Sequence, residues 1–168
     1  MNSYTEVDEY GTKRWKNEND ELHRLDGPAV EFANGDKTWW VDDKRHRLDG
    51  PAVEYADGDK EWYQNDKLHR LDGAAVEYSN GSKEWWVNGQ RHRLDGPAID
   101  WKTKKAWYQN GKRHRLDGPA FEWPNGDKEW WIEGNKCTEE QFKTKIETMS
   151  RPCKGKKIVV DGVEYTLA

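Results

Sequence analysis

The stretch His23-Arg24-Leu25-Asp26-Gly27-Pro28-Ala29 occurs in five copies along this chain. The other copies begin at His46, His69, His92 and His114, and the third copy has Ala74 in place of the proline. Successive copies start 23, 23, 23 and 22 residues apart, and together they contain all five histidines of the protein. A fixed short period predicts a repeat architecture, in which each unit packs mainly against its neighbours. The 22-residue interval contains Lys102–Ala106, which predicts a shortened hairpin turn.

The composition indicates a folded chain with a thin core. Only 33% of the residues are hydrophobic and 36% are charged, yet the chain contains 11 Trp and 7 Tyr. Disordered chains are poor in aromatic residues, and each buried aromatic side chain covers a large area. The formal net charge of −4 argues against binding to double-stranded nucleic acid and against adhesion to anionic membranes.

The sequence contains no sign of export or membrane insertion. No apolar run approaches the length of a membrane span, and Met1–Glu6 lacks the basic and apolar regions of a signal peptide. Two cysteines, Cys137 and Cys153, do not make a disulfide framework. We therefore expect a cytoplasmic protein with reduced thiols.

One repeat, read over Ala52–Asp72, predicts a β-hairpin followed by a connector. Ala52–Tyr55 alternates apolar and polar residues, Asp57-Gly58 favours a tight turn, and Lys60–Gln64 reads as the returning strand. Asn65-Asp66 predicts a second turn, and the Asp-Gly-Pro part of the repeated phrase predicts a bend. The fold class expected is an all-β repeat array, an elongated and curved antiparallel meander of about five 23-residue hairpins.

The repeats divide the chain into three parts. Residues 1–22 read as a degenerate half-repeat that caps the N-terminal end, and residues 23–136 hold the five hairpin repeats. Residues 137–168 predict a C-terminal cap made of a short helix and a closing hairpin over 158–167. Thr138-Glu139-Glu140-Gln141 is a capping box, and the spacing of Phe142, Ile146 and Met149 predicts an apolar helix face.

The length of the first turn decides which residues share a face of the sheet. A two-residue turn would place Val53 opposite Trp62 and Glu54 opposite Glu61, whereas a three-residue turn would reverse the faces. With the two-residue turn, the first aromatic of each strand pair is expected to form the core. These residues are Trp39, Trp62, Trp85, Trp107 and Trp130. Facing glutamates would repel, so we expect the connector arginines to form a recurrent Arg–Glu ladder.

The second aromatic of each pair is the candidate binding residue, because on this register it points to the glutamate-bearing face. Arginines of the connectors complete the candidate surface, since arginine and aromatic side chains dominate interface energetics. The candidate ligand-binding or partner-binding residues are Trp40, Tyr63, Trp86, Tyr108 and Trp131, with Arg47, Arg70, Arg93 and Arg115.

The histidine and aspartate of the repeated phrase are interpreted as structural joints between repeats. Equivalent residues in successive hairpins should lie roughly 9–10 Å apart, too far for one metal ion to gather them. A His–Asp acid–base pair is conceivable in any copy, but five equal copies argue against a catalytic centre. We expect no metal, no cofactor and no catalytic residue. The joint residues are His23, His46, His69, His92, His114, Asp26, Asp49, Asp72, Asp95 and Asp117.

The residues over about Val7 to Cys137 resemble MORN-type repeats, and specifically the branch found in bacterial antitoxin-like proteins. The resemblance rests on Gly-Pro-Ala, a following aromatic, Asn-Gly, a Trp-rich strand and a second Asn-Gly. The form His-Arg-x-Asp-Gly-Pro-Ala is similar to repeat proteins of tailed bacteriophages. The resemblance implies a β-hairpin array that acts as a non-catalytic scaffold and that would work in the host cytoplasm if the chain is phage-encoded. The His-Arg-Leu-Asp segment departs from ordinary MORN repeats.

Two functions therefore stand as expectations. The first is a non-enzymatic scaffold that grips a host or phage protein through an aromatic and arginine surface. The second is an anti-defence sponge that sequesters a small cyclic nucleotide, since arginine can hold phosphate and aromatics can stack on bases. The exposed ends of the array would also allow a homodimer.

Overall fold

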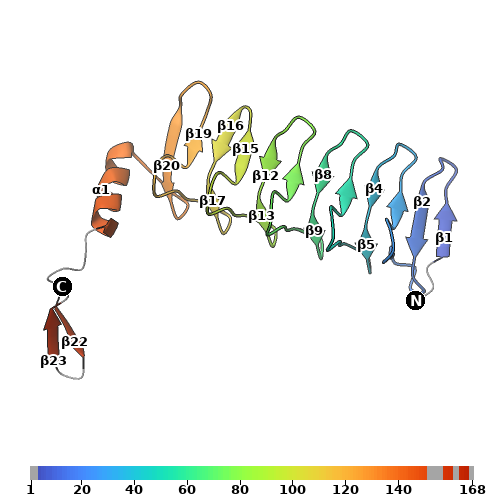
Figure 1. Ribbon diagram of the computed structural model, residues 1–168, viewed down its shortest axis with the longest axis horizontal. Coiled ribbons are helices and arrows are strands. Elements are labelled where there is room, and N and C mark those ends of the chain that lie inside the picture. The colour runs from blue at the N-terminus through green and yellow to red at the C-terminus, as the bar shows by residue number, and fades with distance from the viewer. Residues whose placement is uncertain (1–3, 151–156, 161–162, 167–168) are drawn as a thin grey trace.

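The protein is an open row of β-hairpins with one helix at the C-terminal end of the row. The computed structural model describes residues 4–150, 157–160 and 163–166. Figure 1 shows the hairpins side by side from β1 (Tyr4–Val7) to β20 (Lys128–Ile132), with α1 (Glu139–Ser150) beyond them. The predicted all-β antiparallel meander is confirmed.

Thirteen of the described strands form one antiparallel sheet whose hydrogen-bonded order is also the chain order. Neighbouring strands are therefore joined by local connections throughout. The strands are β1, β2 (Lys13–Lys16), β3 (Val30–Glu31), β4 (Lys37–Thr38), β7 (Val53–Glu54), β8 (Lys60–Glu61), β11 (Val76–Glu77), β12 (Lys83–Glu84), β15 (Ile99–Trp101), β16 (Lys104–Ala106), β19 (Phe121–Glu122), β20 and β21 (Asn135–Cys137). We call β3–β4 and its equivalents the upper hairpins.

A second row of short hairpins lies below the first in Figure 1, and we call these the lower hairpins. They are β5 (Trp40–Val41) with β6 (Lys44–Arg45), β9 (Tyr63–Gln64) with β10 (Lys67–Leu68), β13 (Trp86–Val87) with β14 (Gln90–Arg91), and β17 (Tyr108–Gln109) with β18 (Lys112–Arg113). Backbone bonds also link one lower hairpin to the next, as where Asp66 N–H donates to the Arg45 carbonyl at 3.0 Å. Each repeat thus turns at the top, descends, turns at the bottom and enters its connector.

The upper turn is one residue longer than predicted. Tyr55 N–H donates to the Asp59 carbonyl, and Gly58 N–H donates to the Tyr55 carbonyl, both at 3.0 Å. Gly58 has φ +97°, so a type I turn is followed by a glycine in a left-handed conformation. The loop therefore holds three residues, Ala56–Gly58, rather than two.

The longer loop reverses the predicted faces. Val53 lies opposite Glu61, so the predicted pairing of Val53 with Trp62 is wrong. Trp62 and the other first aromatics instead share a face with Glu54 and its equivalents. This face also carries the connectors, and we call it the connector face. The other side, which carries Val53, Glu61 and the second aromatics, is called the aromatic face.

The predicted lower turns and the shortened fourth unit are confirmed. Asn88 and Gly89 both have positive φ, at 51° and 77°, as a type I′ two-residue turn requires. In the fourth unit Trp101 pairs directly with Lys104, which leaves a two-residue upper loop.

Small residues, not tryptophans, occupy the most buried positions. The alanine that ends each repeated phrase is completely buried on the connector face, while a branched or aromatic residue follows it on the aromatic face. The alanines are Ala29, Ala52, Ala75, Ala98 and Ala120, and the next residues are Val30, Val53, Val76, Ile99 and Phe121. The first tryptophans are only half-buried, so the prediction that they form the core is wrong. In a single-layer sheet an indole lies on the surface unless another side chain covers it.

Helix α1 packs against the last strands of the array. The capping box is confirmed, since Thr138 N–H donates to Gln141 Oε1 at 3.0 Å and Gln141 N–H donates to Thr138 Oγ1 at 3.2 Å. Phe142 is buried and Ile146 packs beside it, whereas Met149 is exposed. The predicted closing hairpin is present as β22 (Lys157–Val160) paired with β23 (Val163–Thr166) in a separate sheet. Its expected turn at 161–162 lies outside the described residues.

Candidate functional site: the connector face

The connectors are the segments formed by the repeated phrase between one lower hairpin and the next upper hairpin. The arginine of each connector donates hydrogen bonds within that connector, and its guanidinium lies over a first tryptophan. In the third connector, Arg70 Nε donates to Asp72 Oδ1 at 2.9 Å, and its Nη1 donates to the Ala74 carbonyl and to Glu77 Oε1 at 3.1 Å. The guanidinium lies 4.1 Å from the centre of the Trp62 ring, within cation–π distance. The arginine therefore joins the connector, the strand and the indole.

The same arrangement recurs along the array. The arginine–tryptophan distances run from 3.8 to 4.2 Å over the pairs Arg24–Trp15, Arg47–Trp39, Arg70–Trp62, Arg93–Trp85 and Arg115–Trp107. Arg–Glu ion pairs occur at Glu31, Glu54, Glu77 and Glu122, as expected. The expected reason for them is wrong, because Glu54 and Glu61 do not face each other but lie on opposite faces of the sheet. Arg93 has no such partner in the described structure, because the equivalent residue is Asp100, which is shorter and pairs with Lys105 at 3.3 Å.

The glycine of the repeated phrase leaves room for this packing. A Cβ at Gly73 would lie 2.9 Å from Arg70 Cζ, and the other connector glycines would bring their Cβ to between 2.8 and 3.0 Å of theirs. Such distances are shorter than real Cβ contacts, so an added methyl group would force the guanidinium to shift from its place between the connector backbone and the indole. The position of the arginine in the repeated phrase therefore depends on the glycine three residues later.

Each histidine contacts the lower turn of the following repeat. His69 Nδ1 accepts the Asn88 backbone N–H at 3.2 Å, and His92 Nδ1 accepts that of Asn110 at 3.1 Å. At the two ends of the array the histidine contacts a carboxylate of the lower turn. His23 Nδ1 lies 2.8 Å from Asp42 Oδ1, and His114 Nδ1 lies 3.0 Å from Glu133 Oε1. His23 and His114 are buried, and the three inner histidines are half-buried. These contacts link adjacent repeats.

The second aromatics lie on the opposite side of the sheet from the connector arginines. Trp86 Nε1 donates to Glu84 Oε2 at 3.0 Å, and Arg91 lies 4.6 Å from the Trp86 ring. Tyr63 is buried against Val53, with Arg45 3.9 Å from its ring. Trp40, Tyr108 and Trp131 are half-buried. The structure therefore separates the two sets of candidate binding residues onto different faces.

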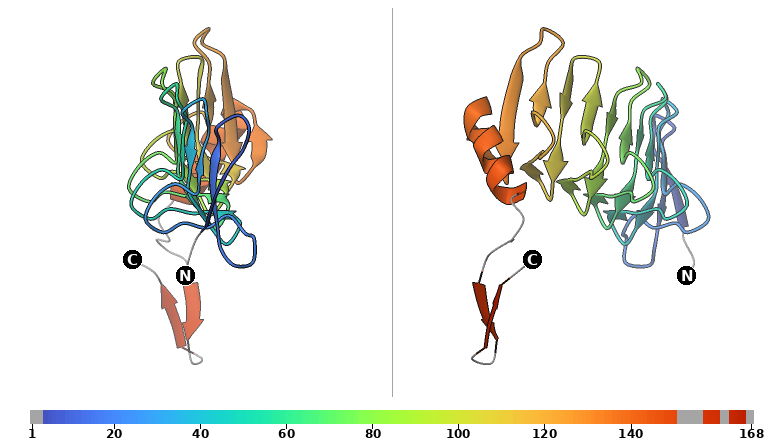
Figure 2. Two further views of the ribbon diagram at one scale, coloured as in Figure 1. Left: turned by 90° about the vertical axis from the view of Figure 1, so that its right-hand side faces the viewer. Right: turned by 60° about the vertical axis from the view of Figure 1, so that its left-hand side comes forward.

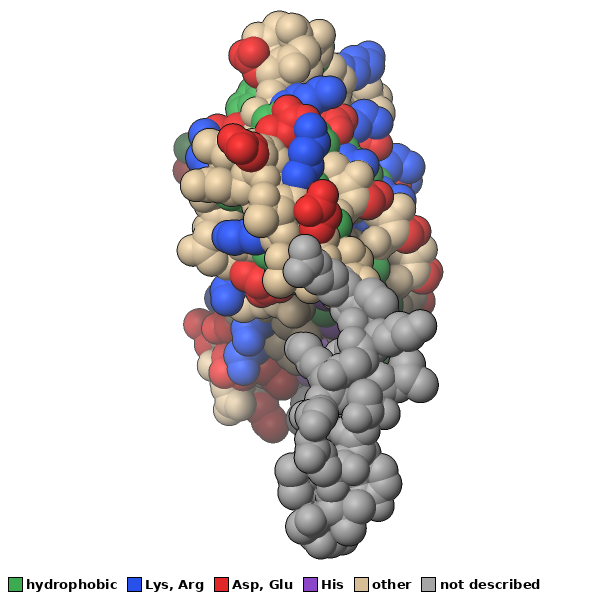
Figure 3. All heavy atoms as spheres, turned by 90° about the vertical axis from the view of Figure 1, so that its left-hand side faces the viewer, with side chains coloured by type: hydrophobic (Ala, Val, Ile, Leu, Met, Phe, Trp, Pro, Cys, Tyr) green, Lys and Arg blue, Asp and Glu red, His purple; other side chains and the backbone are tan. Residues whose placement is uncertain are grey.

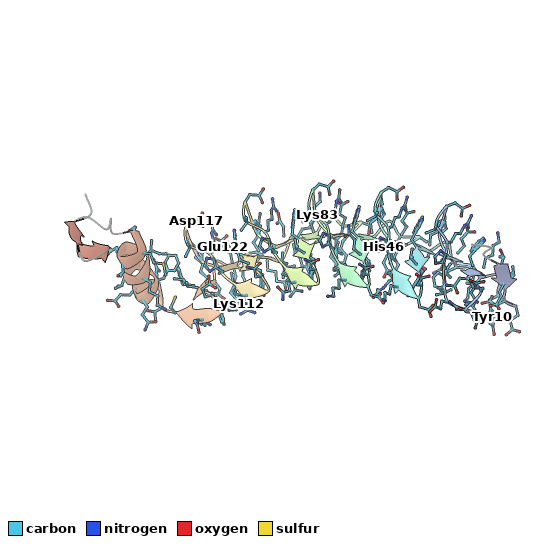
Figure 4. All side chains as sticks on the ribbon, turned by 90° about the horizontal axis from the view of Figure 1, so that it is seen from below. Tyr10, His46, Lys83, Lys112, Asp117 and Glu122 are labelled. Atoms are coloured by element: carbon cyan, nitrogen blue, oxygen red, sulfur yellow. The ribbon has the colours of Figure 1, made fainter. Side chains whose placement is uncertain are left out.

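Every connector carries an exposed leucine, and the three most exposed large apolar residues of the described chain are among them, a feature not predicted from the sequence. The leucine of each phrase is exposed: Leu25 78%, Leu48 78%, Leu71 80%, Leu94 74% and Leu116 46%. Figure 2 shows the connectors curving outward from the sheet. In Figure 4 the connector residue Asp117 lies among side chains that project from one side of the array. The signal was available in the sequence, since a leucine between Arg and Asp in a predicted bend has no strand to face into.

Four equivalent grooves lie between successive connectors. Each is walled by two Arg-Leu-Asp segments and floored by a first tryptophan and the residue two positions later. Their volumes are about 730, 690, 640 and 500 Å³ from the N-terminal groove to the C-terminal groove. The floor residue alternates between apolar and polar in the order Val41, Gln64, Val87 and Gln109.

A row of carboxylates borders these grooves. The side chains of the connector aspartates are 83–85% exposed, whereas the arginines that they bind are 19–23% exposed. The hydrogen bond from the arginine lowers the pKa of each aspartate, so the charged form of the carboxylate is favoured. The rim therefore presents negative charge to solvent, with the matching positive charge beneath it. At the C-terminal end of the array, basic and acidic side chains lie intermixed (Figure 3).

Within the described part of the chain, no three His, Cys, Asp or Glu side chains come together as a metal site would require. Cys137 is buried against the last strands as a free thiol, 3.6 Å from the Trp130 carbonyl. The described residues also include no helix that is long and apolar enough to cross a membrane. Comparison of the chain with family models finds no match, and comparison with curated proteins finds none either.

Proposed function

We propose that the chain is a non-catalytic scaffold whose connector face binds a protein partner across several repeats. The single observation that carries the proposal is the row of exposed leucines, one for each connector, beside four equivalent grooves. A monomeric protein seldom exposes aligned large apolar side chains unless they meet another surface. Burial of one leucine contributes about 1.5–3 kcal/mol, so several together would supply a substantial binding free energy.

The equality of the repeats supports binding rather than catalysis. A catalytic centre needs a nucleophile, an acid or base and a stabilising group converging on one point. Here the histidines contact turns of the next repeat, and the arginines contact the aspartates and most of the strand glutamates. A repeated surface suits an elongated partner, because each added repeat adds the same contacts. If the chain is phage-encoded, that partner would be a host or phage protein.

The experiment compares the two faces with matched variants. The variant L48S/L71S/L94S removes the apolar rim, and F32S/Y55S removes two aromatic-face residues that are each 40% exposed. Immobilised proteins would be exposed to a lysate of cells in which the protein is naturally made, and the captured proteins quantified by mass spectrometry. A partner that the wild type and F32S/Y55S capture, but the leucine variant does not, is expected. Equal capture by the leucine variant would refute the assignment to this face, and a further W86A variant would test the second aromatics.

Sequestration of a small cyclic nucleotide is the alternative function. Grooves of 500–730 Å³ are large enough for such a ligand, and each has a tryptophan in its floor. The connector arginines, however, already donate to Asp, to backbone carbonyls and in most repeats to Glu, which leaves fewer donors for a phosphate. A thermal-shift panel of cyclic nucleotides tests this function, because a ligand present at 100 times its Kd should stabilise the fold by about 2.7 kcal/mol.

A further inference from the structure

The connector grooves fit a particular kind of partner. Resting on the proposed function, we propose that they receive a proline-rich segment in the polyproline II conformation, with Lys or Arg at one position of each three-residue turn. Three observations carry this inference: the spacing of the grooves, the apolar walls and aromatic floor, and the carboxylate rim.

The spacing of the repeats matches the polyproline II period. Each repeat adds two hydrogen-bonded strands to the main sheet, so successive grooves lie about 9.6 Å apart. A polyproline II helix advances about 9.3 Å for each turn of three residues, so every third residue meets an equivalent groove. In a β-strand three residues span about 10 Å, but side chains alternate and every second groove would be missed. Seven residues of an α-helix span about 10.5 Å, which falls out of step by about 1 Å per repeat.

The walls and floor suit proline. In the first groove the Trp39 indole, which carries the Arg47 guanidinium over its ring, lies in the floor; Pro28 lies in one wall, and Leu25 and Leu48 border the opening. Aromatic-lined grooves bind proline-rich segments because the polyproline II backbone is already ordered and loses little entropy on binding. A proline ring also needs no hydrogen-bond partner for its own nitrogen. The grooves therefore favour a ligand with a rigid apolar residue at every third position.

The rim supplies charge complementarity. The outward groups beside the grooves are carboxylates that are 83–85% exposed, such as Asp49 and Asp72, and the arginines lie beneath them. A residue of the ligand that does not enter the groove passes this rim once in every turn. A cationic residue there would be attracted to a carboxylate, whereas an anionic residue would be repelled.

The alternating floor refines the expected ligand. Val41 and Val87 make two floors more apolar, and Gln64 and Gln109 make the other two more polar. The ligand should therefore show a six-residue pattern in which apolar and polar residues alternate at every third position. Four grooves span about 29 Å, which corresponds to about ten residues of polyproline II.

The test uses the full chain and synthetic peptides. The probe is a fluorescein-labelled peptide with five Pro-Pro-Lys units, titrated by fluorescence anisotropy. One control contains five Pro-Pro-Glu units, and a second inserts Gly after each Pro-Pro-Lys unit so that the three-residue period is broken. We expect the probe to bind and both controls to bind at least tenfold more weakly. The variant D49N/D72N/D95N, checked for folding by circular dichroism, should bind more weakly and with less salt dependence.

Each outcome decides part of the inference. Failure of the Pro-Pro-Lys probe to bind would overturn it, and equal binding of the period-broken peptide would overturn the spacing argument on which it depends. Equal binding of the Pro-Pro-Glu peptide would overturn the role of the rim. If the probe fails while partner capture still depends on the leucines, the proposed function stands and only the polyproline inference falls.

Discussion

At the scale of single residues, the repeated phrase works as one unit built around its arginine. The arginine covers an indole, its hydrogen bonds tie the connector to the strand, and the glycine leaves room for it. The sequence predicts that Arg70 and its equivalents belong to a binding surface, but in the structure their Nε and Nη1 groups donate to the connector and the strand. Leu71, which received no role, is 80% exposed beside them. Residue type alone did not predict that this leucine points into solvent, because leucine side chains are ordinarily buried.

The first prediction concerns the packing between arginine and glycine. The substitution Gly73→Ala should destabilise the fold by about 1–3 kcal/mol, because the new Cβ displaces Arg70 from the Trp62 ring and from its charged hydrogen bonds. Denaturant unfolding measures the change. In a Arg70→Ala background the same substitution should cost much less, since the clash is gone. An equal cost in both backgrounds would show that the glycine acts independently of the arginine.

The second prediction concerns acid stability at the same joint. The hydrogen bond from Arg70 lowers the pKa of Asp72 below its usual 3.8 in the folded state. The contact therefore stabilises the fold at pH values above 3.8, and this contribution is lost as the pH falls through the lower folded-state pKa. The stability difference between the wild type and Asp72→Asn should be present at pH 6 and should shrink at pH 3, measured by urea unfolding. A difference that is the same at both pH values would contradict the pKa shift.

At the scale of the elements, the period predicted most of the fold but not the register. Two turn signals and a connector in every 23 residues were sufficient for an antiparallel meander, and Asn88-Gly89 forms the two-residue turn that it predicted. Asp57-Gly58 fits either a two-residue or a three-residue loop, and that choice is made by backbone hydrogen bonds such as Tyr55 to Asp59. The one additional residue in the upper loop places the first aromatics on the face predicted for the second aromatics, and the reverse. The residues predicted for the core and for the binding site therefore changed sides.

The third prediction tests the glycine of the upper turn. Gly58→Ala should destabilise the fold by about 1–2 kcal/mol, because Gly58 has φ +97° and an L-residue rarely adopts that conformation. Thr103→Ala is the matched control, since Thr103 lies in the two-residue upper loop, where neither residue has a positive φ. The control should change the free energy of unfolding by less than about 0.5 kcal/mol. Equal costs would contradict the assignment of the three-residue loop.

At the scale of the whole molecule, the chain is a nearly one-dimensional object in which each repeat meets only its neighbours. The buried alanines let consecutive units approach closely, and the arginines and histidines fasten each connector to the strands and to the following turn. Such an array has two ends, and its last described strand in the main sheet is β21. An uncovered strand edge presents unpaired backbone groups to another chain.

The last prediction concerns how α1 protects that end. Phe142 and Ile146 cover a cluster formed by Ile132, Cys137 and Trp130, so a chain that ends at Cys137 would expose both this apolar cluster and the edge of β21. We expect that shortened chain to associate more strongly than the full chain as its concentration rises, measured by light scattering after size-exclusion chromatography. A chain that ends at Ser150 keeps α1 and should behave like the full chain, because it retains Phe142 and Ile146 on the cluster. If the chain ending at Cys137 associates no more than the control, then α1 adds local packing but does not protect the edge, and the array tolerates an open end.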